Sequence, residues 1–246
     1  MASKKSRLDL LLVKKKVAPS RQHASALITS GNVLVDGIPR DKPGSLVSPE
    51  AAIEIKGKGL PYVSRGGLKL EAALQATGMD VSGMVCLDVG ASTGGFTDCL
   101  LQNGAKKVYA VDVGYGQLAW ALRTDPRVTA IERTNIRHMP REKLATPVDL
   151  VTIDTSFISL KLVVPAVLKF IREKAAIFAL IKPQFEVGKG QVGKGGVVRD
   201  ESRHKQVIAG LKIFFRDSGL VTEAVVPSPI LGPKGNREFM VYLKGS

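Results

Sequence analysis

The chain has little of several features that define common classes of protein. Only 2 of its 246 residues are cysteines, Cys86 and Cys99, and they match neither a disulfide framework nor a zinc-ligand pattern. Aromatic residues make up 5% of the chain, and residues 1–60 contain none. Charged residues interrupt the two longest apolar stretches, 8–13 and 162–181, which excludes a signal-peptide core and a membrane span. We therefore expect a soluble cytoplasmic protein that holds no metal.

Acidic residues are also scarce relative to basic ones. The chain has 36 Lys and Arg against 22 Asp and Glu, for a formal net charge of +14. Such an excess indicates a polyanionic partner, with nucleic acid first and an anionic membrane second. The alternative is a protein that is merely basic and soluble. Hydrophobic residues at 44% exclude a wholly disordered chain.

One glycine-rich segment follows an apolar run and precedes a helical pattern. Residues 85–89 predict a buried strand that contains Asp88, and three glycines follow before a helix over 97–103. Such a turn lets a nucleotide-type cofactor approach the backbone closely. A tight turn without a ligand is the alternative, since the full G-x-G-x-x-G pattern is missing. Asp112 favours the cofactor, because it ends the next strand near the ~20-residue spacing of a ribose-binding carboxylate.

Strand and helix patterns alternate from about residue 80 onward, as is typical of a parallel sheet covered on both faces. Helical patterns include 160–172 and 200–217. The strand patterns lie at 85–90, 107–112, 128–131, 148–154, 175–182, 221–226 and 238–243. The last two follow one another without a helix. We expect a Rossmann-like α/β fold with a mostly parallel seven-stranded sheet and a terminal hairpin, the arrangement of methyl-donor-dependent enzymes.

Residues 1–59 predict a separate small α+β domain. Helical patterns over 7–13 and 21–30 precede a hairpin around the Asp36-Gly37 turn and a strand over 52–55. This order resembles the small RNA-binding domain typified by ribosomal protein S-four. Residues 60–64 would be a linker, and 65–246 the second domain.

The resemblance to the S-four domain implies that basic side chains contact RNA phosphates, which supplies affinity without choice of base. The glycine- and lysine-rich segment 186–196 of the second domain would be an RNA clamp, or else a simple loop. A solvated helix end is the alternative for the lysines at 14–16. The RNA-binding candidates are Arg7, Lys14, Lys15, Lys16, Arg21, His23, Lys42, Arg65, Lys189 and Lys194.

Four charged residues stand at strand or helix ends near the glycine-rich edge. They are Lys69, Asp154, Lys182 and Glu238. Lysine is almost never buried without a partner, so a lysine that ends a buried strand indicates a function or an ion-pair network. The set resembles the Lys-Asp-Lys-Glu set of the FtsJ-like ribose 2′-O-methyltransferases. The two-domain order resembles the TlyA (hemolysin A) family over nearly the whole chain.

This resemblance implies an S-adenosylmethionine-dependent enzyme that methylates the 2′-hydroxyl of cytidine in ribosomal RNA, within ribosomal subunits. Lys182 would be the central proton acceptor, Lys69 a neighbouring cation, and Asp154 the group that holds both lysines. Glu238 would orient Lys182 or the ribose. The cofactor-binding candidates are Asp88, Gly90, Ser92, Gly94, Gly95, Phe96, Asp112 and Asn135.

Two other functions stay open at this point. A non-catalytic RNA-binding or ribosome-assembly factor would keep the fold, although the intact set of four charged residues argues against it. A membrane-lytic hemolysin is disfavoured, because the sequence shows neither a signal peptide nor a membrane span.

Overall fold

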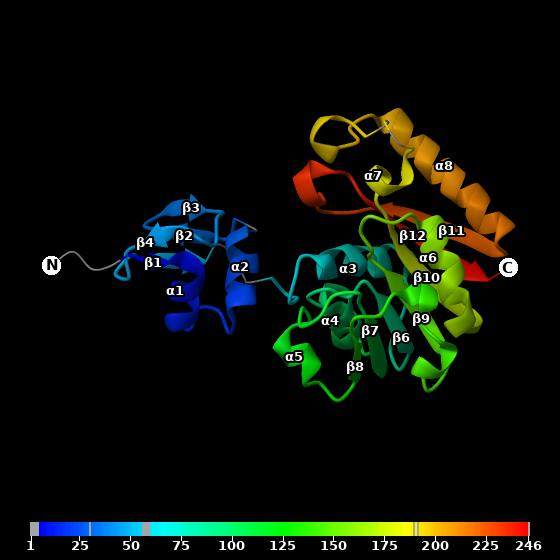
Figure 1. Ribbon diagram of the computed structural model, residues 1–246, viewed down its shortest axis with the longest axis horizontal. Coiled ribbons are helices and arrows are strands. Elements are labelled where there is room, and N and C mark those ends of the chain that lie inside the picture. Colours follow the sequence, from blue (N-terminus) through cyan, green and yellow to red (C-terminus); the bar gives the residue numbers. More distant parts are fainter. Residues whose placement is uncertain (1–4, 30, 56–59, 189, 191, 246) are drawn as a thin grey trace. The chain divides into compact units, whose positions relative to one another are not determined.

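The computed structural model describes residues 5–29, 31–55, 60–188, 190 and 192–245, and the chain divides into two compact units (Figure 1). The units are Met1–Ser64 and Arg65–Ser246. In the described part of the chain, no helix is long and apolar enough to cross a membrane.

The first unit is a small α+β domain. Its helices are α1 (Leu8–Lys14) and α2 (Arg21–Thr29), and its strands are β1 (Ser6–Arg7), β2 (Val33–Val35), β3 (Ile38–Arg40), β4 (Leu46–Val47) and β5 (Ile53–Ile55). Strands β3, β2 and β5 form an antiparallel sheet in that order, and β1 pairs with β4. The helices bury apolar side chains such as Leu8, Leu12 and Ile28 in one core with Val33 and Val35. The Ser20 hydroxyl accepts a hydrogen bond from the His23 N–H at 3.2 Å and so caps α2.

The second unit is a seven-stranded sheet flanked by helices. Its helices are α3 (Gly66–Thr77), α4 (Gly95–Gln102), α5 (Trp120–Arg123), α6 (Leu160–Val167), α7 (Pro183–Glu186) and α8 (Glu201–Asp217). Its strands are β6 (Val85–Val89), β7 (Lys107–Val111), β8 (Val128–Ile131), β9 (Val148–Ile153), β10 (Ile171–Ile181), β11 (Leu220–Pro227) and β12 (Phe239–Gly245). Short 3₁₀ turns occupy 136–138, 141–143, 168–170, 194–196 and 233–235.

The strand order is β11-β12-β10-β9-β6-β7-β8, and β12 runs in the opposite direction to the other six strands. This confirms the mostly parallel Rossmann-like sheet with a terminal hairpin. One face of the sheet packs on α6 and α8, while α4 packs on β6 and β7 and α3 packs on β11 and β12. The pairing of β11 with β12 shifts register between Thr222 and Ala224. Because β6, β7, β9 and β10 are parallel, their carboxyl ends lie at one edge of the sheet.

The helix expected over 160–172 is shorter than its sequence pattern, and the next strand begins earlier. Helix α6 ends at Val167, and β10 starts at Ile171 instead of residue 175. At this start Ile171 pairs with Val148 of β9, and the Arg172 guanidinium contacts the Asp149 carboxylate at 2.6 Å and donates to the Pro147 carbonyl. These contacts hold the charged start of β10 extended beside β9.

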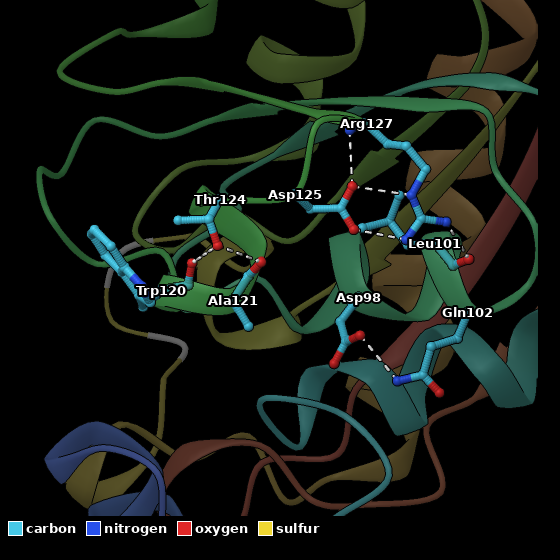
Figure 2. A network of polar contacts seen from close by, with 8 residues as sticks. All are labelled: Asp98, Leu101, Gln102, Trp120, Ala121, Thr124, Asp125 and Arg127. Atoms are coloured by element: carbon cyan, nitrogen blue, oxygen red, sulfur yellow. Dashed lines mark hydrogen bonds and ion pairs between the residues drawn. The ribbon is translucent and has the colours of Figure 1, made fainter.

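Polar contacts fix the turn between α5 and β8 against α4 (Figure 2). The Asp125 carboxylate accepts hydrogen bonds from the backbone N–H and the guanidinium of Arg127, at 2.7–3.0 Å. The same guanidinium donates to the Leu101 carbonyl near the end of α4. The indole of Trp120 points away from this network, and the residue is 74% exposed. The network therefore ties the turn before β8 to the end of α4, the helix that follows the glycine-rich turn.

Truncating Phe215 tests whether α8 is held by its buried face. Phe215 is fully buried in the sheet core, whereas Ile213 of the same helix is 53% exposed. We expect Phe215→Ala to lower the free energy of unfolding by about 3–5 kcal/mol. Ile213→Ala is the control and should change it by about 0.5 kcal/mol or less. Urea titrations monitored by circular dichroism measure both, and equal losses would contradict this packing.

Candidate functional site

Two buried lysine–carboxylate pairs lie at the edge of the sheet. Lys69 Nζ contacts Glu238 Oε2 at 2.6 Å, and Lys182 Nζ contacts Asp154 Oδ1 at 2.6 Å. Lys69, Lys182 and Glu238 are all buried, while the Asp154 side chain is 22% exposed. The Lys182–Asp154 contact is an ion pair without the alignment of a good hydrogen bond, and Lys182 also donates to the Ser156 hydroxyl at 3.1 Å.

Four different elements supply these side chains. Lys69 comes from the first turn of α3, and Asp154 and Lys182 directly follow β9 and β10. Glu238 directly precedes β12, and Ile181 pairs with Phe239, so Lys182 and Glu238 flank the last register pair of the two strands. The structure thus brings the four residues to one edge in a pairing that differs from the expected one. Each lysine has its own carboxylate, where Asp154 was expected to hold both.

A cavity of about 520 Å³ opens at the same edge. Its apolar lining includes Val89 and Val111, at the ends of β6 and β7, and residues of the loops that follow the strands. Its polar lining includes the carboxylates of Asp112 and Asp154. Five of the residues singled out from the sequence line it: Gly90, Ser92, Asp112, Asn135 and Asp154. Other lining residues include Val89, Val113, Gln117, Thr155, Ser156, Phe157 and Ile158. Gly94, Gly95, Phe96 and Asp88 are buried behind this surface and do not line it.

The Asp88 carboxylate is fully buried between β6, α4 and β9. Its Oδ2 accepts hydrogen bonds from the N–H and hydroxyl of Thr97, at 3.0 and 2.7 Å, and its Oδ1 accepts from the Thr152 hydroxyl at 3.0 Å. Burial raises the pKa of Asp88 to about 6, although these hydrogen bonds oppose the rise. Asp88 therefore joins the first turn of α4 to two strands, and its contact with a cofactor stays a prediction.

Gly90 requires glycine for two reasons. Its φ is +82°, and a Cβ at this position would lie 2.6 Å from the carbonyl oxygen of Asp154. The glycine turn thus passes directly against the loop that carries Asp154. The turn therefore lies next to the Lys182–Asp154 ion pair. A side chain here would strain the turn and push Asp154 away.

Asp112 and Asn135 shape the far side of the cavity. The Asp112 carboxylate accepts hydrogen bonds from the N–H groups of Ser92 and Gly114, at 2.8 and 2.7 Å. Because each carboxylate oxygen has more than one acceptor site, both can still bind ligand hydroxyls. The Asn135 side chain accepts from the Arg137 N–H at 3.0 Å and caps a 3₁₀ turn.

The sequence reasoning missed three consecutive cavity residues, Thr155, Ser156 and Phe157. The Thr155 hydroxyl is buried and has no hydrogen-bond partner among the described residues, so it is available to a ligand. Phe157 has a φ of +62° and is 89% exposed, with its ring centroid 5.0 Å from that of Phe185. A bulky residue in this conformation is unusual. An aromatic residue three positions after the strand-ending Asp154 is the sequence feature that could have indicated it.

Glu186 ties the segment after β10 to α6. Its carboxylate accepts hydrogen bonds from the Ser159 hydroxyl at 2.6 Å and from the Leu160 N–H at 2.8 Å, which caps the start of α6. Burial raises the pKa of Glu186. The contact fixes the loop that bears Asp154 relative to the loop that bears Lys182.

In the first unit, the predicted RNA-binding arginines have an intramolecular partner. Asp9 is buried, and its carboxylate accepts hydrogen bonds from Arg7 at 2.9–3.0 Å and from Arg21 at 2.9 Å. The hydrogen bonds from Arg7 hold the pKa of Asp9 well below its usual range. Lys15 donates to the Ala51 carbonyl at 2.9 Å.

The other basic candidates differ in exposure. Lys14, Lys16, Lys42 and Arg65 are exposed, and His23 is half-buried. Lys189 lies outside the described residues, and so does the side chain of Lys194. Contact of this whole set with RNA stays a prediction.

Comparison with known families agrees with this architecture. The model of the FtsJ-like methyltransferase family matches residues 62–245, and the model of the S4 domain matches residues 6–53. The chain belongs to the FtsJ-like methyltransferase family. The matches confirm the two-part layout that was recognised from the sequence.

Several relatives share the length of this FtsJ-like methyltransferase. It is 46% identical over 243 residues to the 16S/23S rRNA (cytidine-2′-O)-methyltransferase TlyA of Mycobacterium tuberculosis, covering 98% of this chain and 91% of the relative. It is 39% identical over 237 residues to Hemolysin A of Brachyspira hyodysenteriae, covering 96% and 98%. A solved structure of a hemolysin candidate from Streptococcus thermophilus is 42% identical, with a TM-score of 0.79, covering 100% and 90%.

Replacing Asp88 with asparagine tests the buried carboxylate of the FtsJ-like domain. The pKa of Asp88 is about 6 in the folded protein, against an ordinary value of 3.8, so the folded state binds this proton more tightly. Its contribution to the free energy of unfolding is therefore complete below about pH 4 and is lost as the pH rises through 6. We expect that decline between pH 4 and 7 to be shallower in Asp88→Asn. Urea titrations across this range measure it, and parallel curves would contradict the assignment.

Gly90→Ala tests the close approach at the cofactor edge. We expect the affinity for S-adenosylmethionine to fall at least about tenfold, equal to 1.4 kcal/mol, because the new methyl group displaces the Asp154 backbone. Calorimetry measures this affinity. Gly104→Ala is the control: its φ of +88° imposes similar strain, but its nearest neighbour is Ser82, away from the cavity. Equal losses in both variants would attribute the effect to strain alone.

Proposed function

We propose that the protein transfers a methyl group from S-adenosylmethionine to the 2′-hydroxyl of cytidine in ribosomal RNA. The observation that carries the proposal is the convergence of Lys69, Asp154, Lys182 and Glu238 beside a cavity at the carboxyl edge of the sheet. Its substrate would be the RNA within ribosomal subunits, and its location would therefore be the cytoplasm. The names of the TlyA relatives and the net charge of +14 support an RNA substrate.

The residues around the cavity fit S-adenosylmethionine. A cavity of about 520 Å³ lies within the range of small-molecule sites. Asp112 suits the ribose hydroxyls, and Gly90 leaves room for close approach. The Thr155 hydroxyl, which has no partner in the described part of the chain, suits a polar group. Asn135 and Ile136 would border the adenine. When bound, S-adenosylmethionine supplies an electrophilic methyl group on a sulfonium centre.

The chain's own task is to orient the ribose hydroxyl and remove its proton. A hydroxyl is a weak nucleophile, so a positioned proton acceptor accelerates its attack. In our proposal the Lys182 ammonium first releases a proton to solvent, and the resulting amine takes the proton of the 2′-hydroxyl. The proton ends on Lys182, and the Asp154 carboxylate at 2.6 Å balances the charge of the ammonium that forms. Ser156 holds the Lys182 ammonium from the cavity side.

Lys69 and Glu238 have a supporting role in this proposal. The Lys69 ammonium gives the edge a second positive charge, and Glu238 neutralises it in the buried interior. Removing either partner would leave a buried charge without compensation.

Lys182→Ala separates chemistry from binding. We expect kcat for methyl transfer to unmodified ribosomal subunits to fall by about 100- to 10,000-fold, the range of general-base catalysis. The affinity for S-adenosylmethionine, measured by calorimetry, should stay within about threefold of wild type, because Lys182 does not line the cavity. Lys174→Ala is the matched control, since Lys174 is exposed near the opposite end of β10.

Three outcomes would contradict the proposal. Retained turnover of Lys182→Ala would remove its role as proton acceptor. Absence of methyl transfer by the wild-type protein to either subunit would favour an assembly factor. Leakage of liposomes without S-adenosylmethionine would favour a lytic protein. Mapping of 2′-O-methyl sites in cells with and without the protein identifies the modified nucleotide.

A further inference from the structure

The Glu238 carboxylate has a second neighbour besides Lys69, and that neighbour lies against its other oxygen. Its Oε2 contacts Lys69, whereas its Oε1 is buried without a hydrogen-bond partner among the described residues. Gly232 covers this second oxygen. A Cβ on Gly232 would lie 2.0 Å from Oε1, 2.4 Å from Cδ and 3.0 Å from Oε2.

Space, and not backbone conformation, requires glycine at this position. The φ of Gly232 lies outside the left-handed region that favours glycine. The contact distances lie below 3.0 Å for the carboxylate oxygen and carbon, so any other residue would displace the carboxylate or the loop. Gly232 therefore has a packing role against a charged group of the candidate site.

Backbone hydrogen bonds hold Gly232 in place over the carboxylate. The Gly232 N–H donates to the Asn236 carbonyl at 2.8 Å, and the Gly235 N–H donates to the Gly232 carbonyl at 3.1 Å. The Ser228 N–H donates to the carbonyl of Glu238 itself at 2.9 Å. The loop between β11 and β12 is thus held by backbone hydrogen bonds near its start, at Ser228, and near its end, at Asn236 and Glu238.

The Asn236 side chain joins this loop to the segment after β10. Asn236 is buried; its Nδ2 donates to the Gly196 carbonyl and its Oδ1 accepts from the Val198 N–H, both at 3.0 Å. His204 Nε2 donates to the Val198 carbonyl at 2.8 Å, and its ring lies edge-on to that of Phe239. Residues 196–198 are therefore fixed to the same loop that covers Glu238.

We propose that Gly232 and Asn236 are positioning residues for methyl transfer. Together they hold the Glu238 carboxylate against Lys69 and join the segment 193–198 to it. The inference rests on the proposed function and deepens it, because it assigns to Glu238 an action through Lys69 and not on the substrate. Glu238 is covered by Gly232 and does not line the cavity, which supports that division of roles.

A side chain at position 232 would act on the ion pair. It would push the carboxylate away from Lys69 and leave a buried ammonium without its partner. Displacement of a catalytic group by about 1 Å can cost about 100-fold in rate. Loss of the Asn236 clamp would release the loop that keeps Gly232 in place, with a smaller effect in the same direction.

Gly232→Ala is the decisive variant. We expect kcat to fall about 100-fold, with the affinity for S-adenosylmethionine within about threefold of wild type. A crystal structure of the variant should show the Lys69–Glu238 contact opened beyond hydrogen-bond distance. That measurement needs no activity, so it tests the inference even where the wild-type protein fails to methylate RNA and the proposed function falls. An unchanged 2.6 Å pair would overturn the inference.

A double-mutant cycle with Glu238→Asp separates positioning from loss of fold. The shorter side chain withdraws from the new methyl group, so the two substitutions affect one interaction. We expect the double variant to lie within about threefold of the slower single variant, where independent effects would multiply to about 10,000-fold. Multiplicative losses would overturn the inference.

Two further variants complete the test. Asn236→Asp keeps the acceptor for the Val198 N–H and loses the donor to Gly196, and we expect about a tenfold lower kcat with unchanged cofactor affinity. Gly104→Ala imposes the same φ of +88° outside this loop, against Ser82. It should keep kcat within about threefold of wild type. Wild-type kcat in Asn236→Asp, or a loss in Gly104→Ala equal to that of Gly232→Ala, would overturn the inference.

Discussion

The geometry of the candidate site depends on the buried Asp88 carboxylate. It accepts hydrogen bonds from the first turn of α4 and from β9, and thereby joins the glycine turn to the strand that ends at Asp154. A buried carboxylate costs free energy unless its oxygens are satisfied, and here three donors satisfy them. These hydrogen bonds fix the position of the glycine turn relative to β9. Gly90, two residues after Asp88, lies directly against the Asp154 backbone.

Charge pairing organises the rest of the edge. Two ammonium groups and two carboxylates enter a largely buried region as two pairs, so none of the four charges lacks a counter-charge. Replacing both members of a buried pair costs far less stability than removing one of them. The four residues therefore depend on one another structurally as well as in the proposed chemistry. The flanking loops are held differently, by hydrogen bonds from backbone N–H groups to the Glu186 carboxylate and the Asn236 amide oxygen.

Local patterns were sufficient for the sheet and for the identity of the edge residues. Buried parallel strands read as continuous apolar runs, and acids at 88, 112 and 154 marked their carboxyl ends. The pairing of Lys69 with Glu238 could not be predicted, because it depends on β12 lying beside β10 and under α3. The start of β10 was missed because residues 171–174 have a charged, helix-like pattern, whereas their pairing beside β9 involves residues distant in the sequence.

Packing roles were also hidden from sequence reasoning. Nothing in the sequence around Asp88 tells whether its carboxylate contacts a ligand or is buried and bonded to neighbouring elements. Asp9 draws Arg7 and Arg21 into an ion-pair cluster that only the folded first unit creates. The φ of Gly232 is one that any residue can adopt, so the position of the Glu238 side chain explains why this residue is glycine.

The register shift in β11 has a consequence for the behaviour of the sheet as a whole. β11 is an edge strand, and its unpaired backbone groups could template pairing with another chain. The shift leaves Glu223 as an extra, exposed residue between Thr222 and Ala224, so a charge and a local bend interrupt the free edge. At the opposite edge, β8 is only four residues long. Both margins of the sheet are thus poor templates for strand-to-strand aggregation.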